Sequence, residues 1–205
     1  MRRTAEKEIL TNLSEMKNIV IFASGNGTNC ENIIRFFSHD NDVKVAAVIT
    51  NNASAKVIDR ARKWNVPVRV MTRNDINDRE KLLPVLEEYA TRLIVLAGFM
   101  LFIPDFLVEA YEGRIINIHP SLLPKYGGKG MYGMNVHKAV KANGETKSGI
   151  TIHHVSNEYD KGRIIAQFST PLSPGDSAED IAMKVHELEY RHYPEVIEQL
   201  LKKED

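Results

Sequence analysis

The sequence predicts an α/β fold: a single domain with a mainly parallel, twisted sheet and helices on both faces. Short apolar segments rich in β-branched residues alternate with amphipathic segments at the interval of βαβ units, a pattern typical of a parallel sheet covered on two sides. A glycine-containing turn directly follows the first strand, as in sheets that bind nucleotides. The chain has 205 residues, which is about one domain at roughly 100–200 residues per domain.

The first half of this domain, 18–112, alternates four expected strands with four expected helices and resembles a nucleotide-binding half-sheet. Its first strand is short, apolar and ended by Gly25. Because Pro67 cannot donate to a sheet ladder, the third strand should be short or lie near an edge. The expected elements are strand Asn18–Ser24, helix Thr28–Phe37, strand Val43–Thr50, helix Ala55–Trp64, strand Val66–Met71, helix 78–91, strand Arg92–Ala97 and helix Pro104–Tyr111.

The second half, 113–205, follows without a linker, so we expect one domain over 18–205 behind a polar extension at 1–17. Asn143-Gly144 marks the end of one helix, and Asp176-Ser177 is a suitable N-cap for the last one. The expected elements are strand Arg114–His119, a glycine-rich loop Pro120–Gly133, helix Asn135–Ala142, strands Ser148–Val155 and Gly162–Thr170, and a long amphipathic helix from Ser177.

The composition excludes several classes of protein. Lys plus Arg and Asp plus Glu each number 27, so the formal net charge is zero, which argues against a broad nucleic-acid surface. No apolar run approaches the 18 or so residues of a membrane span, and no apolar segment follows the charged N-terminus as in a secretory signal. A single cysteine, Cys30, excludes an intramolecular disulfide. We therefore expect a cytoplasmic protein without membrane or nucleic-acid partners.

The segment Ser24 to Asn29, S-G-N-G-T-N, is the first candidate site. Its glycines allow an anion to approach the backbone, and the helix that begins there offers unpaired N–H groups and a partial positive charge. Position 30 is Cys rather than the third glycine of a dinucleotide fingerprint, and no G-K-[ST] of a Walker loop follows. A phosphate monoester site is favoured over the alternative of a plain tight turn.

Asn117, His119 and Asp160 form the second group of candidates. Side chains alternate along a strand, so Asn117 and His119 share one face near a strand's carboxyl end, where open α/β sheets bind ligands. An amide donor and an imidazole can stabilise an oxyanion and move a proton. Taken alone, His119 is more typical of a structural histidine, and Asp160 of a residue that hydrogen-bonds the backbone of its own turn.

Other polar signals carry less weight. His153 and His154 are adjacent in a strand, so they face opposite ways and cannot chelate together. His186-Glu187 begins like the zinc motif H-E-x-x-H, but position 190 is Tyr. No metal site is therefore expected. Cys30 lies on an apolar helix face and is expected in the core.

In their order along the chain, these segments resemble the glycinamide ribonucleotide transformylases, which are folate-dependent formyltransferases of purine synthesis. The resemblance extends from Asn18 to about Leu201. It implies the formyltransferase fold, with a Rossmann-like first half. The segments that carry it are N-I-V-I-F-A-S-G-N-G-T-N, A-V-I-T-N, V-L-A-G-F-M, I-I-N-I-H-P-S-L-L-P-K-Y, D-K-G-R-I-I-A-Q and V-H-E-L-E-Y-R-H-Y-P.

The resemblance also implies roles for individual residues. The formyl group would pass from 10-formyltetrahydrofolate, a co-substrate, to the amine of glycinamide ribonucleotide, without a metal. The catalytic residues would be Asn117, His119 and Asp160. The ribonucleotide would be held by Gly27, Thr28, Asn29, His186 and Glu189, with Glu189 at the ribose hydroxyls, and the folate by Arg79, Phe99, Met100, Leu101, Val155 and Asp160.

Three positions depart from that pattern. Leu101 stands where many relatives carry a basic residue, so the folate tail would be held differently. His186 replaces a frequent Gln, and imidazole is a suitable phosphate contact. The loop Tyr126–His137 is longer than in some members, and its glycines are typical of a mobile segment over a site.

Three alternatives stay open at this point. Methionyl-tRNA formyltransferase shares the Asn, His and Asp arrangement, but it should add a C-terminal domain for tRNA. Formyltetrahydrofolate hydrolase should carry an extra N-terminal domain, whereas about 17 residues precede the first strand here. A non-catalytic nucleotide-binding module would need only the glycine turn. The oligomeric state, monomer or homodimer, is not specified by the sequence.

Overall fold

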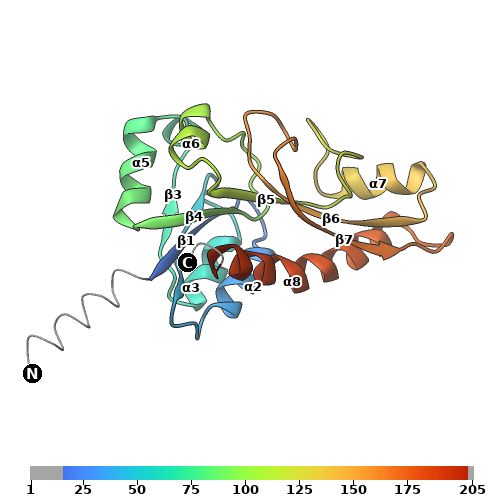
Figure 1. Cartoon of the computed structure of the whole chain (residues 1–205), viewed down its shortest axis with the longest axis horizontal. Helices are drawn as coiled ribbons and strands as arrows, with labels where there is room; N and C mark the ends of the chain where they lie inside the picture. The colour runs from blue at the N-terminus through green and yellow to red at the C-terminus, as the bar shows by residue number, and fades with distance from the viewer. Residues whose placement is uncertain (1–15, 203–205) are drawn as a thin grey trace, which may run out of the picture.

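One sheet of seven strands forms the centre of the computed structural model, which describes residues 16–202 (Figure 1). Its order is β3-β2-β1-β4-β5-β6-β7. Neighbouring strands from β3 to β5 pair in parallel, and β6 and β7 are added antiparallel. The strands are β1 (Lys17–Phe22), β2 (Val43–Thr50), β3 (Val68–Val70), β4 (Thr91–Leu96), β5 (Ile115–His119), β6 (Lys147–His154) and β7 (Ile164–Pro171). Most of the expected extension at 1–17 lies outside the described residues.

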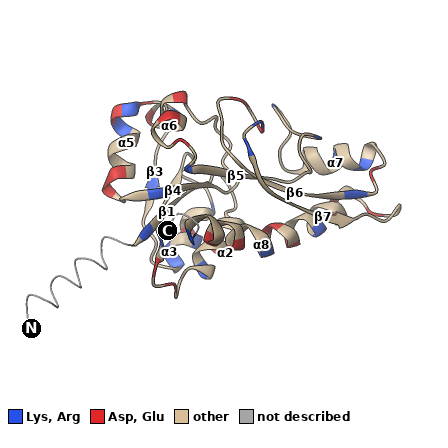
Figure 2. Ribbon diagram, viewed as in Figure 1, with Lys and Arg blue, Asp and Glu red and all other residues tan. Residues whose placement is uncertain are grey.

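Helices cover both faces of this sheet, which confirms the predicted mainly parallel α/β fold. Figure 1 shows α2, α3 and α8 along one face and α5 and α6 on the other, and each group packs on its own core cluster. Both charge signs occur along α5 and along α8 (Figure 2). The helices are α2 (Thr28–Phe36), α3 (Val57–Lys63), α4 (Arg73–Ile76), α5 (Arg79–Glu88), α6 (Asp105–Ala110), α7 (Met134–Ala142) and α8 (Ala178–Lys202).

Two expected elements differ from those in the structure. The single helix expected at 78–91 is preceded by a separate turn of helix, α4, because Thr72 caps that turn and Asp78 then caps α5. Side-chain acceptors at both positions satisfy the first N–H groups of a new helix. The third strand is confined to Val68–Val70 and forms an edge of the sheet, as the proline before it predicts.

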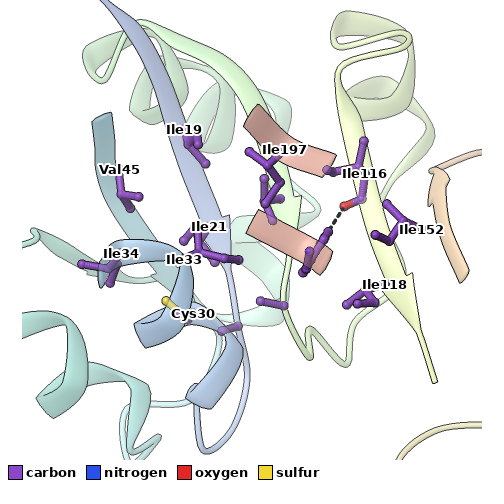
Figure 3. Close-up of a cluster of buried hydrophobic side chains, with 14 of the residues drawn as sticks. Ile19, Ile21, Cys30, Ile33, Ile34, Val45, Ile116, Ile118, Ile152 and Ile197 are labelled. Carbon is purple, nitrogen blue, oxygen red and sulfur yellow. Dashed lines mark hydrogen bonds between the residues drawn. The ribbon is translucent and has the colours of Figure 1, made fainter. Parts of the chain in front are cut away.

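The larger core cluster joins β1, β2, β5 and β6 to α2 and α8 (Figure 3). Cys30 lies within it with no exposed surface, and burial raises the pKa of its thiol to about 12, so its expected place in the core is confirmed. Tyr193 is also fully buried, and burial raises the pKa of its hydroxyl well above the usual value. That hydroxyl donates to the carbonyl oxygen of Leu96 at 2.9 Å and lies 3.5 Å from that of Ile116, so α8 is fixed to the last residue of β4 and the second residue of β5.

The strand order places a functional edge between β1 and β4. The chain runs outward from β1 to β2 and β3, then returns to the other side of β1 and continues through β4 and β5. The carboxyl ends of these parallel strands meet where the direction of winding reverses. Open α/β sheets bind their ligands in the crevice at such a point.

Candidate active site

A cavity of about 1010 Å³ opens at this edge of the sheet. The turn after β1, the loop after β4, the end of β5, the 128–134 loop, the β6–β7 turn and α8 all contribute to its wall. Every candidate site residue named above lines it except Arg79. That residue is the exposed first residue of α5, a helix that packs against β4 and α6, so the structure does not bring it to the cavity.

The glycine turn after β1 is shaped by close packing. Gly27 is the N-cap of α2 with φ of 74°, a left-handed conformation that favours glycine. A Cβ at this position would lie 2.4 Å from Cγ2 of Val57, so a side chain has no room. Arg60 donates to the carbonyl oxygen of Asn26 at 2.8 Å and pairs with Glu31, which fixes the outer side of the turn. This packing holds the first N–H groups of α2 in place at the cavity, and unpaired N–H groups at a helix N-terminus favour anions.

A polar group on α8 faces the same turn. Glu189 accepts from Nδ2 of Asn29 at 2.9 Å, and its same oxygen lies 3.0 Å from Nδ1 of His186. The Oδ1 atom of Asn29 is buried and has no hydrogen-bond partner among the described residues. An acceptor left without a donor in a cavity wall is suited to a ligand hydroxyl.

Asn117, His119 and Asp160, the central group of the site, line this cavity together. Asn117 and His119 lie two residues apart on β5, and Asp160 lies in the turn between β6 and β7 with φ of 55°. Nδ1 of His119 is 3.5 Å from Oδ2 of Asp160. The His119 side chain is 5% exposed and the Asp160 side chain 13%, so the carboxylate is largely shielded from water but open to the cavity.

The sequence pattern did not single out His153, which belongs to this group. It pairs with Asn117 across β5 and β6, and its Nε2 lies 3.2 Å from Nδ2 of Asn117 and 3.8 Å from Oδ1 of Asp160. Its Nδ1 is 2.9 Å from the carbonyl oxygen of His154, so Nδ1 carries the hydrogen and Nε2 accepts from the amide. Burial lowers the pKa of His153, which keeps the ring neutral.

His137 was also missed by the sequence pattern. It lies on α7, lines the cavity, and is buried with no hydrogen-bond partner at Nδ1 among the described residues. Burial lowers its pKa as well. The antiparallel pairing of β5 with β6 is what would have located His153. The apolar spacing of α7, with Val136 and Val140, is what would have indicated that His137 is buried.

These two buried histidines make the folded state sensitive to acid. Folding lowers the pKa of both histidines. As the pH falls below about 6.5, the pKa of histidine in the unfolded chain, the unfolded chain therefore binds protons that the folded chain does not. From pH 7.5 to 5.5 we expect each to reduce the free energy of unfolding by up to about 1.4 kcal/mol. Denaturant titrations at both pH values measure this, and His137→Gln should reduce the loss, whereas His39→Gln at an exposed position should not. A loss unaltered by His137→Gln would contradict the assignment.

Comparison with known proteins identifies the family. Residues 17–197 match the family model described as formyl transferase. The chain belongs to this formyltransferase family. A phosphoribosylglycinamide formyltransferase of Bacillus subtilis is 38% identical over 91% of this chain and 95% of its own, and a chloroplastic one of Arabidopsis thaliana is 39% identical over 88% of this chain and 64% of its own.

Solved structures agree with the fold of this formyltransferase. A phosphoribosylglycinamide formyltransferase of Anaplasma phagocytophilum superposes with a TM-score of 0.84 at 33% identity, over 92% of this chain and 88% of the other. A glycinamide ribonucleotide transformylase of Geobacillus kaustophilus gives 0.82 at 36% identity, over 91% and 99%. The resemblance stated from sequence motifs and the fold class are thereby confirmed, and the protein is a folate-dependent formyltransferase.

Across residues 16–202, no helix is both long and apolar enough to cross a membrane. Within the same described part of the chain, no three His, Cys, Asp or Glu side chains are grouped as metal ligands.

Proposed function

We propose that this formyltransferase transfers the formyl group of 10-formyltetrahydrofolate to the amine of glycinamide ribonucleotide, in purine biosynthesis. The products are formylglycinamide ribonucleotide and tetrahydrofolate. One observation carries the proposal: Asn117, His119 and Asp160 share a cavity with the first N–H groups of α2. The cavity volume, about 1010 Å³, is at the upper end for small-molecule sites and suits two ligands. Relatives at 38–39% identity carry the name of this activity.

The ribonucleotide occupies the side of the cavity formed by α2 and α8. Its phosphate binds the N–H groups around Gly27, Thr28 and Asn29, where the helix dipole favours negative charge. Nδ1 of His186 lies 3.0 Å from Oε2 of Glu189. The His186 ring donates either to that carboxylate or to the phosphate. The ribose hydroxyls donate to Glu189 and to the unpartnered Oδ1 of Asn29.

The folate occupies the apolar side. Phe99, Met100 and Leu101 follow β4, and Val155 follows β6, so two loops enclose the ring system. Beyond them Phe102 and Tyr159 form an edge-to-face pair with ring centroids 4.8 Å apart at the cavity wall. Because Leu101 is apolar, it cannot pair with the glutamate tail, and we propose that it packs on the aryl portion instead.

The reaction follows from the central group. The neutral amine of the ribonucleotide attacks the formyl carbon, a C–N bond forms, and the carbonyl electrons move to oxygen. The amide of Asn117 has one N–H directed at His153 and a second N–H for this oxyanion. Because the Nε2 hydrogen of His119 is bonded to the carbonyl oxygen of Tyr126, the donor that His119 offers the oxyanion is an N–H at Nδ1. Such donors each contribute roughly 3–4 kcal/mol to the barrier reduction.

Asp160 moves the proton. The nitrogen that has attacked becomes acidic, and the carboxylate of Asp160 accepts its proton, directly or through a water molecule. Returning the proton to N10 of the folate allows the C–N10 bond to break, and the formyl group stays on the ribonucleotide. His119, 3.5 Å away, keeps the carboxylate oriented throughout.

A folate absorbance assay with and without glycinamide ribonucleotide tests this function. We expect tetrahydrofolate to form only when the ribonucleotide is present. Turnover without an acceptor would mean a formyltetrahydrofolate hydrolase, and turnover only with methionyl-tRNA would mean the tRNA enzyme. A complete absence of turnover would favour a nucleotide-binding module.

We place this reaction in the cytoplasm, with these small molecules rather than nucleic acid or membrane as partners and no metal required. The plant relative carries the name chloroplastic, so the compartment varies within the family. A monomer and a homodimer are equally compatible with a site built within one chain.

A further inference from the structure

We propose that Tyr126 and Glu145 are positioning residues that hold His119 and Asp160 in place through the backbone of residues 126–128. The inference rests on the proposed formyl transfer. Two hydrogen bonds carry it: Nε2 of His119 donates to the carbonyl oxygen of Tyr126 at 2.7 Å, and the N–H of Gly128 donates to Oδ2 of Asp160 at 2.8 Å. Main-chain atoms two residues apart therefore bind both members of the central pair.

This short backbone segment is in a conformation that needs an external constraint. Tyr126 has φ of 58°, in the left-handed region that residues with side chains rarely adopt. Gly127 is packed so closely that a Cβ there would lie 2.5 Å from Cδ2 of Leu123 and 3.3 Å from Cβ of Asp160. A strained residue at a functional site persists only where its surroundings determine it.

The hydroxyl of Tyr126 supplies that constraint. It donates to Oε1 of Glu145 at 2.9 Å, and Nζ of Lys125 donates to the same oxygen at 2.8 Å. The hydrogen bond from Lys125 is the main cause that lowers the pKa of Glu145, with Tyr126 second, so the acceptor is ionised at neutral pH. Hydrogen bonds to a charged acceptor are roughly twice as strong as neutral ones.

Neither Glu145 nor Tyr126 lines the reaction cavity. Both line a separate cavity of about 340 Å³, together with Lys125, on the other side of the 121–126 loop. Their influence on the reaction therefore passes through the backbone of residues 126–128, which bonds to His119 and to Asp160. By accepting from Nε2, the Tyr126 carbonyl fixes a hydrogen on that nitrogen and directs Nδ1 of His119 at Asp160.

Tyr126→Phe removes the hydroxyl while retaining the ring. We expect kcat to fall about tenfold, with KM for both substrates within twofold, because binding groups are untouched and only the orientation of His119 loosens. In the ligand-free protein, long-range proton–nitrogen NMR of the His119 ring should show a changed Nε2 resonance. Glu145→Leu should reproduce both effects, and Glu145→Gln, which keeps an acceptor, should restore most of kcat.

Tyr89→Phe is the matched control, since the Tyr89 hydroxyl accepts from Arg69 on the surface, outside the reaction cavity. It should leave kcat and the His119 resonances unchanged. If Tyr126→Phe leaves kcat and the Nε2 resonance as in the wild type, the inference is overturned; if that variant does not fold, Glu145→Leu and Glu145→Gln decide in the same way. A wild-type protein that formylates no ribonucleotide would refute the proposed function, while the ligand-free NMR comparison still tests the positioning.

Discussion

Asp160→Asn should lower kcat for formyl transfer by about 10²–10⁴-fold, the range that a positioned proton-transfer group contributes. An amide retains an oxygen that can accept from the N–H of Gly128, so the turn should stay in place. It cannot take the proton that the attacking amine must lose. Steady-state kinetics measure the effect, and the thermal midpoint should stay within a few degrees of the wild type.

Asp59→Asn is a suitable control for this substitution. The Asp59 side chain is 81% exposed and its nearest cation, on Arg62, is 4.0 Å away, so kcat should be unchanged. Near-normal turnover in Asp160→Asn would show that proton transfer proceeds by another route. An equal loss of turnover and of folding would instead make Asp160 a structural residue of the β6–β7 turn.

Gly27→Ala should be the most damaging change in the glycine turn after β1. The left-handed φ and the contact with Val57 act together, because the methyl group would lie 2.8 Å even from the Cα of that residue. We expect a loss of roughly 3 kcal/mol in the free energy of unfolding. For a chain of this length the melting temperature should fall by roughly 6–12 °C. KM for the ribonucleotide should rise at least tenfold in the fraction that folds.

Gly25→Ala tests whether this effect is specific. A Cβ at Gly25 meets nothing within 4 Å, and its φ lies outside the left-handed region. Its melting temperature should stay within about 2 °C of the wild type. Should Gly27→Ala bind the ribonucleotide normally, the phosphate would have to lie elsewhere in the cavity, since the N–H groups at the start of α2 cannot keep their position around a methyl group.

Local pattern was sufficient to predict the parallel half of the fold and much of the cavity wall. The alternation along β5 placed Asn117 and His119 on one face, and the glycine turn after β1 predicted a helix beginning at Thr28, as found. The chain order of such motifs also predicted the family. The first two inferences depend on neighbours within a few residues, where backbone periodicity determines direction, whereas the family was inferred from the order of motifs along the chain.

The rest of the site depended on the register between neighbouring strands, which a local sequence pattern does not specify. His153 joins the central group only because β6 pairs antiparallel with β5 so that it stands opposite Asn117. A shift of one residue would have presented His154 instead. Arg79 depends on packing in the same way: no motif around it specifies how α5 packs against β4 and α6, and in the structure Arg79 does not line the cavity, so its folate role stays a prediction.

The buried hydroxyl of Tyr193 fixes the position of α8, and with it Glu189, relative to the sheet. Glu189 precedes Tyr193 by four residues, so both lie on one side of the helix. Because the Tyr193 hydroxyl contacts the carbonyl oxygens of Leu96 on β4 and Ile116 on β5, it holds the helix in place beside the strand that carries Asn117. In the proposed complex, the ribose hydroxyls at Glu189 and the amine near Asn117 would therefore be held at a constant separation.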